Sequence, residues 1–219
     1  DCQNSLGDIN DDYNTDILDI ISLVNIILSG GINSSEFTDC AISDANMDGN
    51  AVINILDVIS LINIVLGDDR VYSSDDNYAI AQMYYEGSDL IVRIESSSDI
   101  AGVEITINSN QHFLTELKDN SHIETLSNHY DNTLKVVSYN PFNEAFDGHI
   151  VEYRFIDGIT IDQDDLDVII GSPSGDEFYV TTNYNGTVQE VSPDGYKLYD
   201  AYPNPFNPST QVSFSLPKE

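Results

Sequence analysis

The sequence predicts an α+β, multidomain chain, in which a small all-α pair of loop–helix repeats precedes an antiparallel β-sandwich. Three observations predict it: an apolar segment is duplicated near the N-terminus, each copy follows an acidic loop, and short β-rich runs follow from Tyr78 onward. We expect the helical module at residues 1–67, a linker at 68–77, the sandwich at 78–191, and a second linker with one strand at 192–219.

The duplicated segments are "DILDIISLVNIILSG" (residues 16–30) and "NILDVISLINIVLG" (residues 54–67). They match at a constant offset, so that Asp19, Ser22 and Asn25 recur as Asp57, Ser60 and Asn63. Polar residues at a spacing of three within a broad apolar face predict helices rather than strands. A glycine follows each copy, which is typical of a helix end.

The second half of the chain consists of short β-rich runs separated by Asn, Asp, Gly and Ser clusters. The runs are "YAIAQMYY", "DLIVRIES", "IAGVEITI", "TLKVVSY", "HIVEYRFI", "LDVIIG" and "EFYVTTN". Several alternate with a period of two, as "DLIVRIES" shows, and this pattern is typical of an antiparallel sandwich.

The composition limits the partners that the chain can have. It carries 38 acidic and 7 basic residues, a formal net charge of −31. Such a charge repels nucleic acid and anionic membranes and favours bound cations. The alternative explanation of the charge is a generally acidic surface that binds no specific cation. No apolar run is long enough for a membrane span.

The acidic loop before the first helix, "DINDDYNTDILD", fits the frame of an EF-hand-type calcium loop. That frame takes oxygen ligands from alternate positions of a tight loop and from the first turn of the following helix. The candidate ligands of loop one are Asp8, Asn10, Asp12, Asn14, Asp16 and Asp19. The alternative interpretation is a solvated acidic turn that caps the helix.

Loop two allows two frames. The register of the helix gives Asn46, Asp48, Asn50, the carbonyl of Val52, Asn54 and Asp57. The "DxNxDG" match gives Asp44, Asn46 and Asp48 instead, with Gly49 at the turn and a two-residue insertion before Asp57. We prefer the second frame for the early ligands. In loop one, Tyr13 stands where a positive φ normally selects glycine, which predicts weaker binding there.

The stretches "GDINDDYNTDILDIISLVNIIL" and "SDANMDGNAVINILDVISLINIVLG" resemble the paired repeats of a dockerin, a calcium-dependent module that docks onto cohesin domains. The resemblance covers about residues 6–67, and it implies Ca²⁺ at both loops. It also implies partner contacts at Ile17, Leu18, Ser22, Ile55, Leu56 and Ser60. The alternative is that these residues only pack the core of the module itself.

Two further resemblances concern the rest of the chain. "SSSDIAGVEITINSN" (residues 96–110) resembles the early strand of a cohesin-like sandwich, and another immunoglobulin-like sandwich is the alternative. The tail "YPNPFNPSTQVSFSLPKE" resembles the opening of a type IX secretion sorting domain, found at the C-terminus of secreted bacterial proteins. Only the first strand of that domain is present, so we expect the chain to stop inside it.

The two cysteines, Cys2 and Cys40, have no metal-binding spacing. We interpret them as a disulfide formed in an oxidising compartment, with two buried free thiols as the alternative. The four histidines are scattered, and no hydrolase, metalloprotease or phosphate-loop motif is present. We therefore do not expect an enzyme.

Together these features predict an extracellular or cell-surface bacterial protein for calcium-dependent protein–protein assembly. The expected partner is a cohesin-like domain of another chain, which a second copy could supply, so that chains would join head to tail into fibres. Packing of the helical module onto its own sandwich, as a stabilising cap, is the alternative arrangement. The alternative function is a carbohydrate-binding or accessory region of a larger secreted hydrolase, although the chain has no Trp for sugar stacking.

Overall fold

The computed structural model describes residues 6–67, 77–109, 114–118, 122–156 and 161–184, and the backbone of two short strands nearer the C-terminus. The chain divides into two compact units, Asp1–Gly186 and Thr187–Glu219. The first unit holds the helices and both sheets of the sandwich. The second holds the antiparallel pair β10 (Lys197–Leu198) and β11 (Phe214–Ser215). No described helix is long and apolar enough to cross a membrane.

The two predicted helices are present and begin directly after the acidic loops. The helical elements are α1 (Ile17–Leu28), a 3-10 turn η1 (Gly31–Asn33), the short α2 (Asp39–Ala45) and α3 (Ile55–Leu66). Asp16 caps α1 and Asn54 caps α3. In each helix, the aspartate three residues after the cap accepts a hydrogen bond from the backbone N–H of the cap residue. These reciprocal bonds satisfy N–H groups that a helix start leaves unpaired, so both boundaries are fixed locally.

The short helix α2, which lies between the two repeated helices in the sequence, was not predicted. Thr38 caps it by accepting a hydrogen bond from the N–H of Ala41 at 3.1 Å. Ala41 and Ala45 are buried in the core between the helices. Seven residues are too few to show a helical period in the sequence, so the packing of these alanines determines the helix.

The sandwich consists of two sheets. Its strands are β1 (Tyr78–Glu86), β2 (Asp89–Ser96), β3 (Gly102–Asn108), β4 (Leu114–Leu117), β5 (Glu124–Tyr130), β6 (Thr133–Tyr139), β7 (Ile150–Ile156), β8 (Leu166–Gly171) and β9 (Tyr179–Tyr184), with a 3-10 turn η2 (Gln163–Asp165) before β8. Sheet A has the order β4-β7-β2-β1-β9, and sheet B has the order β5-β6-β3-β8. All pairings within these two sheets are antiparallel except that of β1 with β9, which is parallel.

The predicted combination of helices with antiparallel sheets is therefore confirmed. Strands β4 and β5 were not anticipated. The sequence of β5, "ETLSNHY", is mostly polar, and most of its side chains are exposed at the edge of sheet B. An edge strand with one wet face and little apolar content gives no alternating signal.

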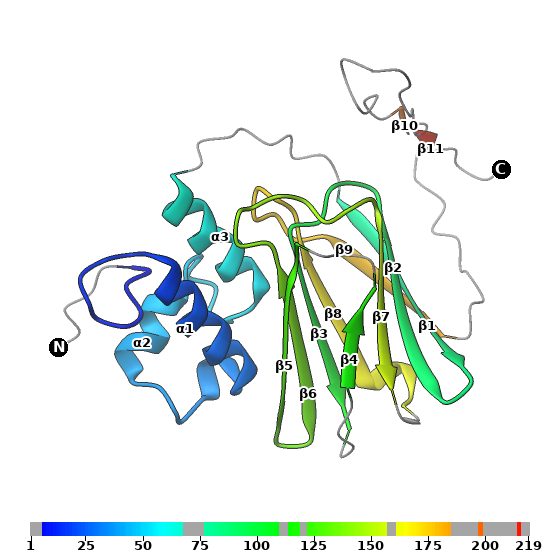
Figure 1. Cartoon of the computed structure of the whole chain (residues 1–219), viewed down its shortest axis with the longest axis horizontal. Helices are drawn as coiled ribbons and strands as arrows, with labels where there is room; N and C mark the ends of the chain where they lie inside the picture. Colours follow the sequence, from blue (N-terminus) through cyan, green and yellow to red (C-terminus); the bar gives the residue numbers. More distant parts are fainter. Residues whose placement is uncertain are drawn as a thin grey trace. The chain divides into compact units, whose positions relative to one another are not determined.

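Sheet B is covered on both of its faces. Its inward side chains, among them Val103, Ile105 and Val136, pack against sheet A in the sandwich core. Its outward side chains Val137 and Tyr139 belong to a second core shared with the helices. Figure 1 shows α1 and α3 on the sheet B side of the sandwich, and α3 contacts β3, β6 and β8.

Two glycines allow α3 to lie against sheet B. Gly102 on β3 and Gly171 on β8 are direct cross-strand partners. A Cβ on Gly102 would lie 2.5 Å from Cγ1 of Ile55, and a Cβ on Gly171 would lie 2.3 Å from Cδ1 of Ile59. Such distances are far below van der Waals contact, so a side chain at either glycine would force the isoleucines of α3 to shift or the helix to move away from the sheet.

Gly171→Ala is therefore expected to destabilise the folded chain by about 1–3 kcal/mol through overpacking. The cost should be much smaller in an Ile59→Ala background, because the truncated side chain leaves room for the new methyl group. Urea unfolding of the two single variants and the double variant measures the coupling. Thr106→Val, at a half-exposed site on β3, is the control and should change stability little. Strictly additive costs would show that Gly171 and Ile59 are not in contact.

Candidate functional site

The contact between α3 and the outward face of sheet B is the candidate functional site. Ile55, Leu56 and Ile59 of α3 are 0, 7 and 0% exposed, and all three lie against the glycine pair. Ile55 and Leu56 were predicted to bind a partner, and here they contact the sandwich of their own chain. Ser60, another predicted contact, has its hydroxyl 3.5 Å from where a Cβ on Gly175 would lie.

The matching positions of the first repeat lie in the opposite environment. Ile17 is 46% exposed, Leu18 is 52% exposed, and Ser22 is half-buried. Ile21, which corresponds to Ile59, is 48% exposed. The two repeats therefore have the same residues at these positions, but only in the second repeat are these residues buried against the sandwich.

A buried carboxylate lies at the N-terminal end of this contact. Glu104 of β3 is 2% exposed, and its Oε2 accepts a hydrogen bond from the N–H of Ile55 at 3.2 Å. Its other oxygen pairs with Lys135 of β6. The first N–H groups of a helix favour a negative charge, so Glu104 fixes the start of α3 on the sheet.

Side-chain amides hold the other ends of the two helices. Asn63 of α3 bonds to Asn143, and both asparagines donate to the carbonyl of Pro173, at 3.2 and 3.3 Å. Asn128 of β5 donates to the carbonyl of Leu28, at the end of α1, at 3.1 Å. Helix ends leave carbonyls unpaired, and the sandwich supplies a donor for this one.

Sequence reasoning missed Gly102, Gly171 and Glu104. One signal was available: Glu104 stands inside the apolar run "GVEITI", where a charge on a strand buried on both faces needs a partner. Gly102 and Gly171 were included in two of the predicted β-rich runs, and no contact was predicted for them. Their role depends on a helix far away in the sequence, which no local pattern indicates.

Each acidic loop closes on a fully buried aspartate. Asp19 accepts hydrogen bonds from the N–H groups of Ile9, Asn10 and Asp16, at 2.8, 3.1 and 2.9 Å. Asp57 accepts from the N–H groups of Met47 and Asn54, at 2.8 and 2.9 Å. These bonds join the start of each loop to the first turn of its helix, so loop and helix fold as one unit.

The hydrogen bonds of the two loops correspond at the offset of the repeated helices. The bonds from Asp12 N–H to Asn10 and from Asn14 N–H to Asp12 recur in loop two, from Asn50 N–H to Asp48 and from Val52 N–H to Asn50. This correspondence favours the frame of Asn46, Asp48, Asn50, Val52, Asn54 and Asp57 over the preferred "DxNxDG" frame. Asp44 lies in α2, outside the loop, and is 3% exposed.

The backbone supports the same frame. Asp11 and Tyr13 have positive φ in loop one, and the equivalent Gly49 and Ala51 have positive φ in loop two. The expected positive φ at Tyr13 is confirmed, at +69°. Its side chain is 81% exposed, and its N–H donates to the carboxylate of Asp8 at 3.0 Å, which helps to hold a non-glycine residue in this strained backbone conformation.

The donor atoms of both loops suit a hard cation. All predicted ligands are carboxylate, amide or carbonyl oxygens, which Ca²⁺ prefers. Asp19 and Asp57 are buried carboxylates, and the described ion pairs include neither of them. A bound cation would supply the missing charge. The described residues contain no cluster of three His, Cys, Asp or Glu side chains that could hold a metal, so asparagine and backbone oxygens would have to complete each site.

Burial raises the pKa of Asp57 to about 6, and the nearby charge of Asp48 acts in the same direction. Hydrogen bonds from the backbone of loop two oppose this shift. In loop one, hydrogen bonding from Asn14 lowers the pKa of the exposed Asp12. A cation at loop two would therefore have to displace a proton from Asp57 under mildly acidic conditions, which makes binding dependent on pH.

The predicted disulfide stays a prediction. No free thiol occurs among the described residues, which include Cys40 on α2. Its expected partner, Cys2, lies outside those residues. Most of the tail that resembles a sorting domain also lies outside them.

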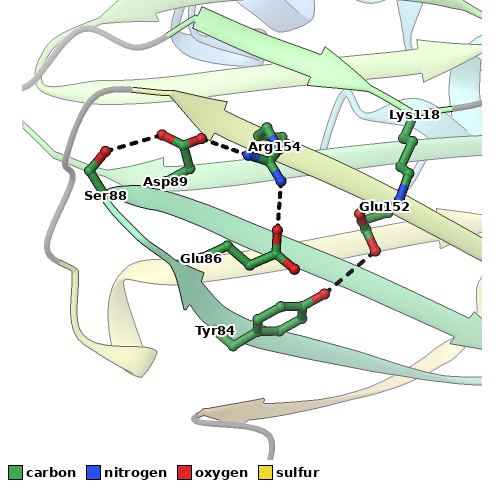
Figure 2. Close-up of polar contacts among 7 residues, drawn as sticks. All are labelled: Tyr84, Glu86, Ser88, Asp89, Lys118, Glu152 and Arg154. Carbon is green, nitrogen blue, oxygen red and sulfur yellow. Dashed lines mark hydrogen bonds and ion pairs between the residues drawn. The ribbon is translucent and has the colours of Figure 1, made fainter.

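The outward face of sheet A carries a network of ion pairs (Figure 2). Arg154 bonds to Asp89 at 2.7 Å and to Glu86 at 2.6 Å, and Lys118 pairs with Glu152 at 3.3 Å. The hydroxyl of Tyr84 lies 3.5 Å from the carboxylate of Glu152. These cations are paired with carboxylates of other strands of sheet A, so the network joins β1, β2 and β7 with Lys118, the residue that follows β4.

We compared the chain with family models, with curated proteins and with solved structures, and only the solved structures gave a match. No family model matches the chain, and no curated protein matches it. Among solved structures, the chain is similar to a non-cellulosomal cohesin from the hyperthermophilic archaeon Archaeoglobus fulgidus, with 17% identity and a TM-score of 0.33. The match covers 49% of this chain and 86% of the cohesin chain.

Glu104 gives the helix contact a pH dependence. Burial raises the pKa of Glu104, while the charge of Lys135 opposes the shift. A raised pKa in the folded chain adds stability below the unfolded value, and that stability is lost as the pH rises through the folded value. The variant Glu104→Gln lacks this titration. Urea unfolding from about pH 4.5 to about pH 7 should therefore show the variant gaining stability relative to the native chain, by up to about 1.4 kcal/mol per unit of pKa difference. If the unfolding free energies of the native chain and of Glu104→Gln changed with pH in parallel, the predicted titration of Glu104 would be contradicted.

Proposed function

We propose that this chain is an extracellular, noncatalytic module for calcium-dependent protein–protein assembly. Its assembly contact is that between a loop–helix repeat and the outward face of a sandwich sheet. The observation that carries the proposal is the fit of Ile55 and Ile59 to the Gly102–Gly171 pair, with Glu104 on the first turn of the helix. A shape-matched apolar centre with charged and amide groups around it is the organisation of a specific protein interface.

Calcium would act on this contact through loop two. Asn54 and Asp57, which are predicted ligands, enclose Ile55 and Leu56 in the sequence. Folding of the loop therefore sets the position of the two side chains that meet the sheet. Loss of the ion would loosen the first turn of α3 and weaken its contact with sheet B.

The contact lies within one chain here, so the resting form that we propose is a closed monomer. Ile17, Leu18 and Ser22 of the first repeat are the residues left to meet a partner protein. Head-to-tail fibres would need α3 to leave its own sheet B for that of the next copy. Tethering through one linker gives the contact within the chain a high effective concentration, which favours the closed form.

Calcium should raise the melting temperature of the intact chain, and chelation should lower it. A ligand that binds only the folded state, at about a hundred times its dissociation constant, stabilises by about 2.7 kcal/mol per site. Asp19→Ala combined with Asp57→Ala should abolish the response to calcium in scanning calorimetry. Magnesium at the same concentration is the ionic-strength control. An identical melt of the native chain in calcium and in chelator would exclude both sites.

Two complementary variants test whether the contact can join separate chains. Gly171→Leu blocks sheet B and frees its α3, whereas Ile55→Asp with Ile59→Asp disables α3 and frees its sheet B. Each variant alone should be monomeric. Their mixture in calcium should form a 1:1 complex of twice the 24.2 kDa chain mass, measured by light scattering after size exclusion.

Chelation should dissociate this complex. A mixture of either variant with itself is the internal control. Failure of two folded variants to associate in calcium, over a range of concentrations, would show that the contact only stabilises the single chain. If the measured mass of the native chain grows with concentration, the native chain assembles head to tail and is not the proposed closed monomer.

A further inference from the structure

The two repeats offer the same side chains, yet only those of α3 lie against the glycine pair of sheet B, while α1 contacts β5 and β6 through other residues. Ile55, Leu56, Ile59, Ser60 and Asn63 of α3 recur unchanged as Ile17, Leu18, Ile21, Ser22 and Asn25 of α1. Shape and hydrophobicity of these positions therefore give sheet B no basis for choosing between the repeats. Apart from the linker, which follows α3 directly in the sequence, the choice comes from positions at which the repeats differ.

The helix cap is such a position, and it lies beside the buried carboxylate of sheet B. Repeat two has the neutral Asn54 as its cap, and repeat one has Asp16. The side chain of Asn54 accepts the N–H of Leu56 at 2.8 Å, and Glu104 accepts the adjacent N–H of Ile55 at 3.2 Å. The two acceptors thus occupy neighbouring donors on one helix turn, and both residues are buried.

We propose that Glu104 and Asn54 form a specificity pair, in which the buried carboxylate of sheet B selects the repeat with a neutral cap and rejects a repeat with an acidic cap. The inference rests on the helix–sheet contact of the proposed function, and it needs neither a second chain nor a bound ion.

The charges around the pair support this selection. Asp57, one turn into the helix, is fully buried. Lys135 is the one basic side chain that pairs with Glu104 among the described residues, and the charge of Asp167 also acts on Glu104. An aspartate in place of Asn54 would add a further negative charge among these groups, away from water. Like charges brought together at a buried contact are strongly unfavourable.

The selection also gives the chain a direction. The acidic cap of repeat one would meet Glu104 if the helix pair turned around, so the pair docks in one orientation. A partner for the exposed face of α1 should then offer a neutral or cationic group where sheet B has Glu104. The apolar faces of α1 and α3 have the same residues at the compared positions. The face of α3 nevertheless binds sheet B, and the face of α1 is left for a partner.

A double-mutant cycle on the intact chain in saturating calcium tests the pair. Amide hydrogen exchange of α3 is compared for the native chain, Asn54→Asp, Glu104→Gln and the double variant. Asn54→Asp should speed exchange at least about tenfold when Glu104 is present, because the new carboxylate would lie on the same helix turn as the buried one. In the Glu104→Gln background the same change should speed exchange less than about threefold, which gives a clear coupling.

Any effect of Asn54→Asp on calcium binding occurs in both backgrounds and cancels from the cycle. Asp11→Asn removes a charge from loop one at an exposed residue that is not a predicted ligand, and it is the control. The described hydrogen bonds place no sandwich carboxylate on the first turn of α1, where Asp16 accepts from the N–H of Leu18. The control should therefore leave the exchange of α3 within about twofold.

Equal acceleration by Asn54→Asp in the two backgrounds would overturn the proposal, and so would a lack of effect with Glu104 present. If Asn54→Asp alone does not fold, the double variant decides: a folded double variant with α3 protected supports the pair, and an unfolded one overturns it. None of these outcomes depends on association between chains, so they are separate from the failure of the assembly function.

Discussion

The close approach of Ile59 to Gly171, and of Ile55 to Gly102, is the constraint on which the rest of this unit depends. Because neither glycine has a Cβ, α3 lies directly on the backbone of β3 and β8. Sheet B thereby becomes a layer buried on both faces, while sheet A keeps one face for its ion pairs. The burial patterns reflect this difference: β1 alternates, whereas β3 is buried at nearly every position. The sequence of a strand therefore depends on what covers its second face.

Local patterns were sufficient for the helices and for most strands. The repeated caps and the spacing of polar residues determine α1 and α3 within a few neighbouring residues, and the alternating runs determine β1, β2 and β7. The parts that could not be predicted depend on distant contacts. Leu18 and Leu56 have closely similar neighbours in the sequence, yet one is half exposed and the other buried, because only the second meets sheet B. No single window of the sequence contains that information.

The loops were predictable in part, for a related reason. The duplicated aspartates Asp19 and Asp57 indicated that each loop closes on its own helix, and their backbone hydrogen bonds have this geometry. The register of loop two was harder to predict, because Gly49 suggested the glycine position of a shifted frame. Positive φ occurs at both Gly49 and Ala51, so the glycine marks one of two left-handed positions in the turn. Composition alone could not separate these alternatives.

Charge limits how this unit can be built. A chain with so few basic residues still buries the carboxylates of Glu104, Asp19 and Asp57. Among the ion pairs of the described residues, only Glu104 of these three has a basic partner, Lys135, while the described arginines pair on sheet A. The two loop aspartates depend on backbone N–H groups, which stabilise a carboxylate but add no net positive charge. Each further buried carboxylate near the start of α3 therefore has no cationic side chain to offset it among the described residues. This shortage makes the difference between Asn54 and Asp16 matter at a contact whose apolar residues are otherwise the same.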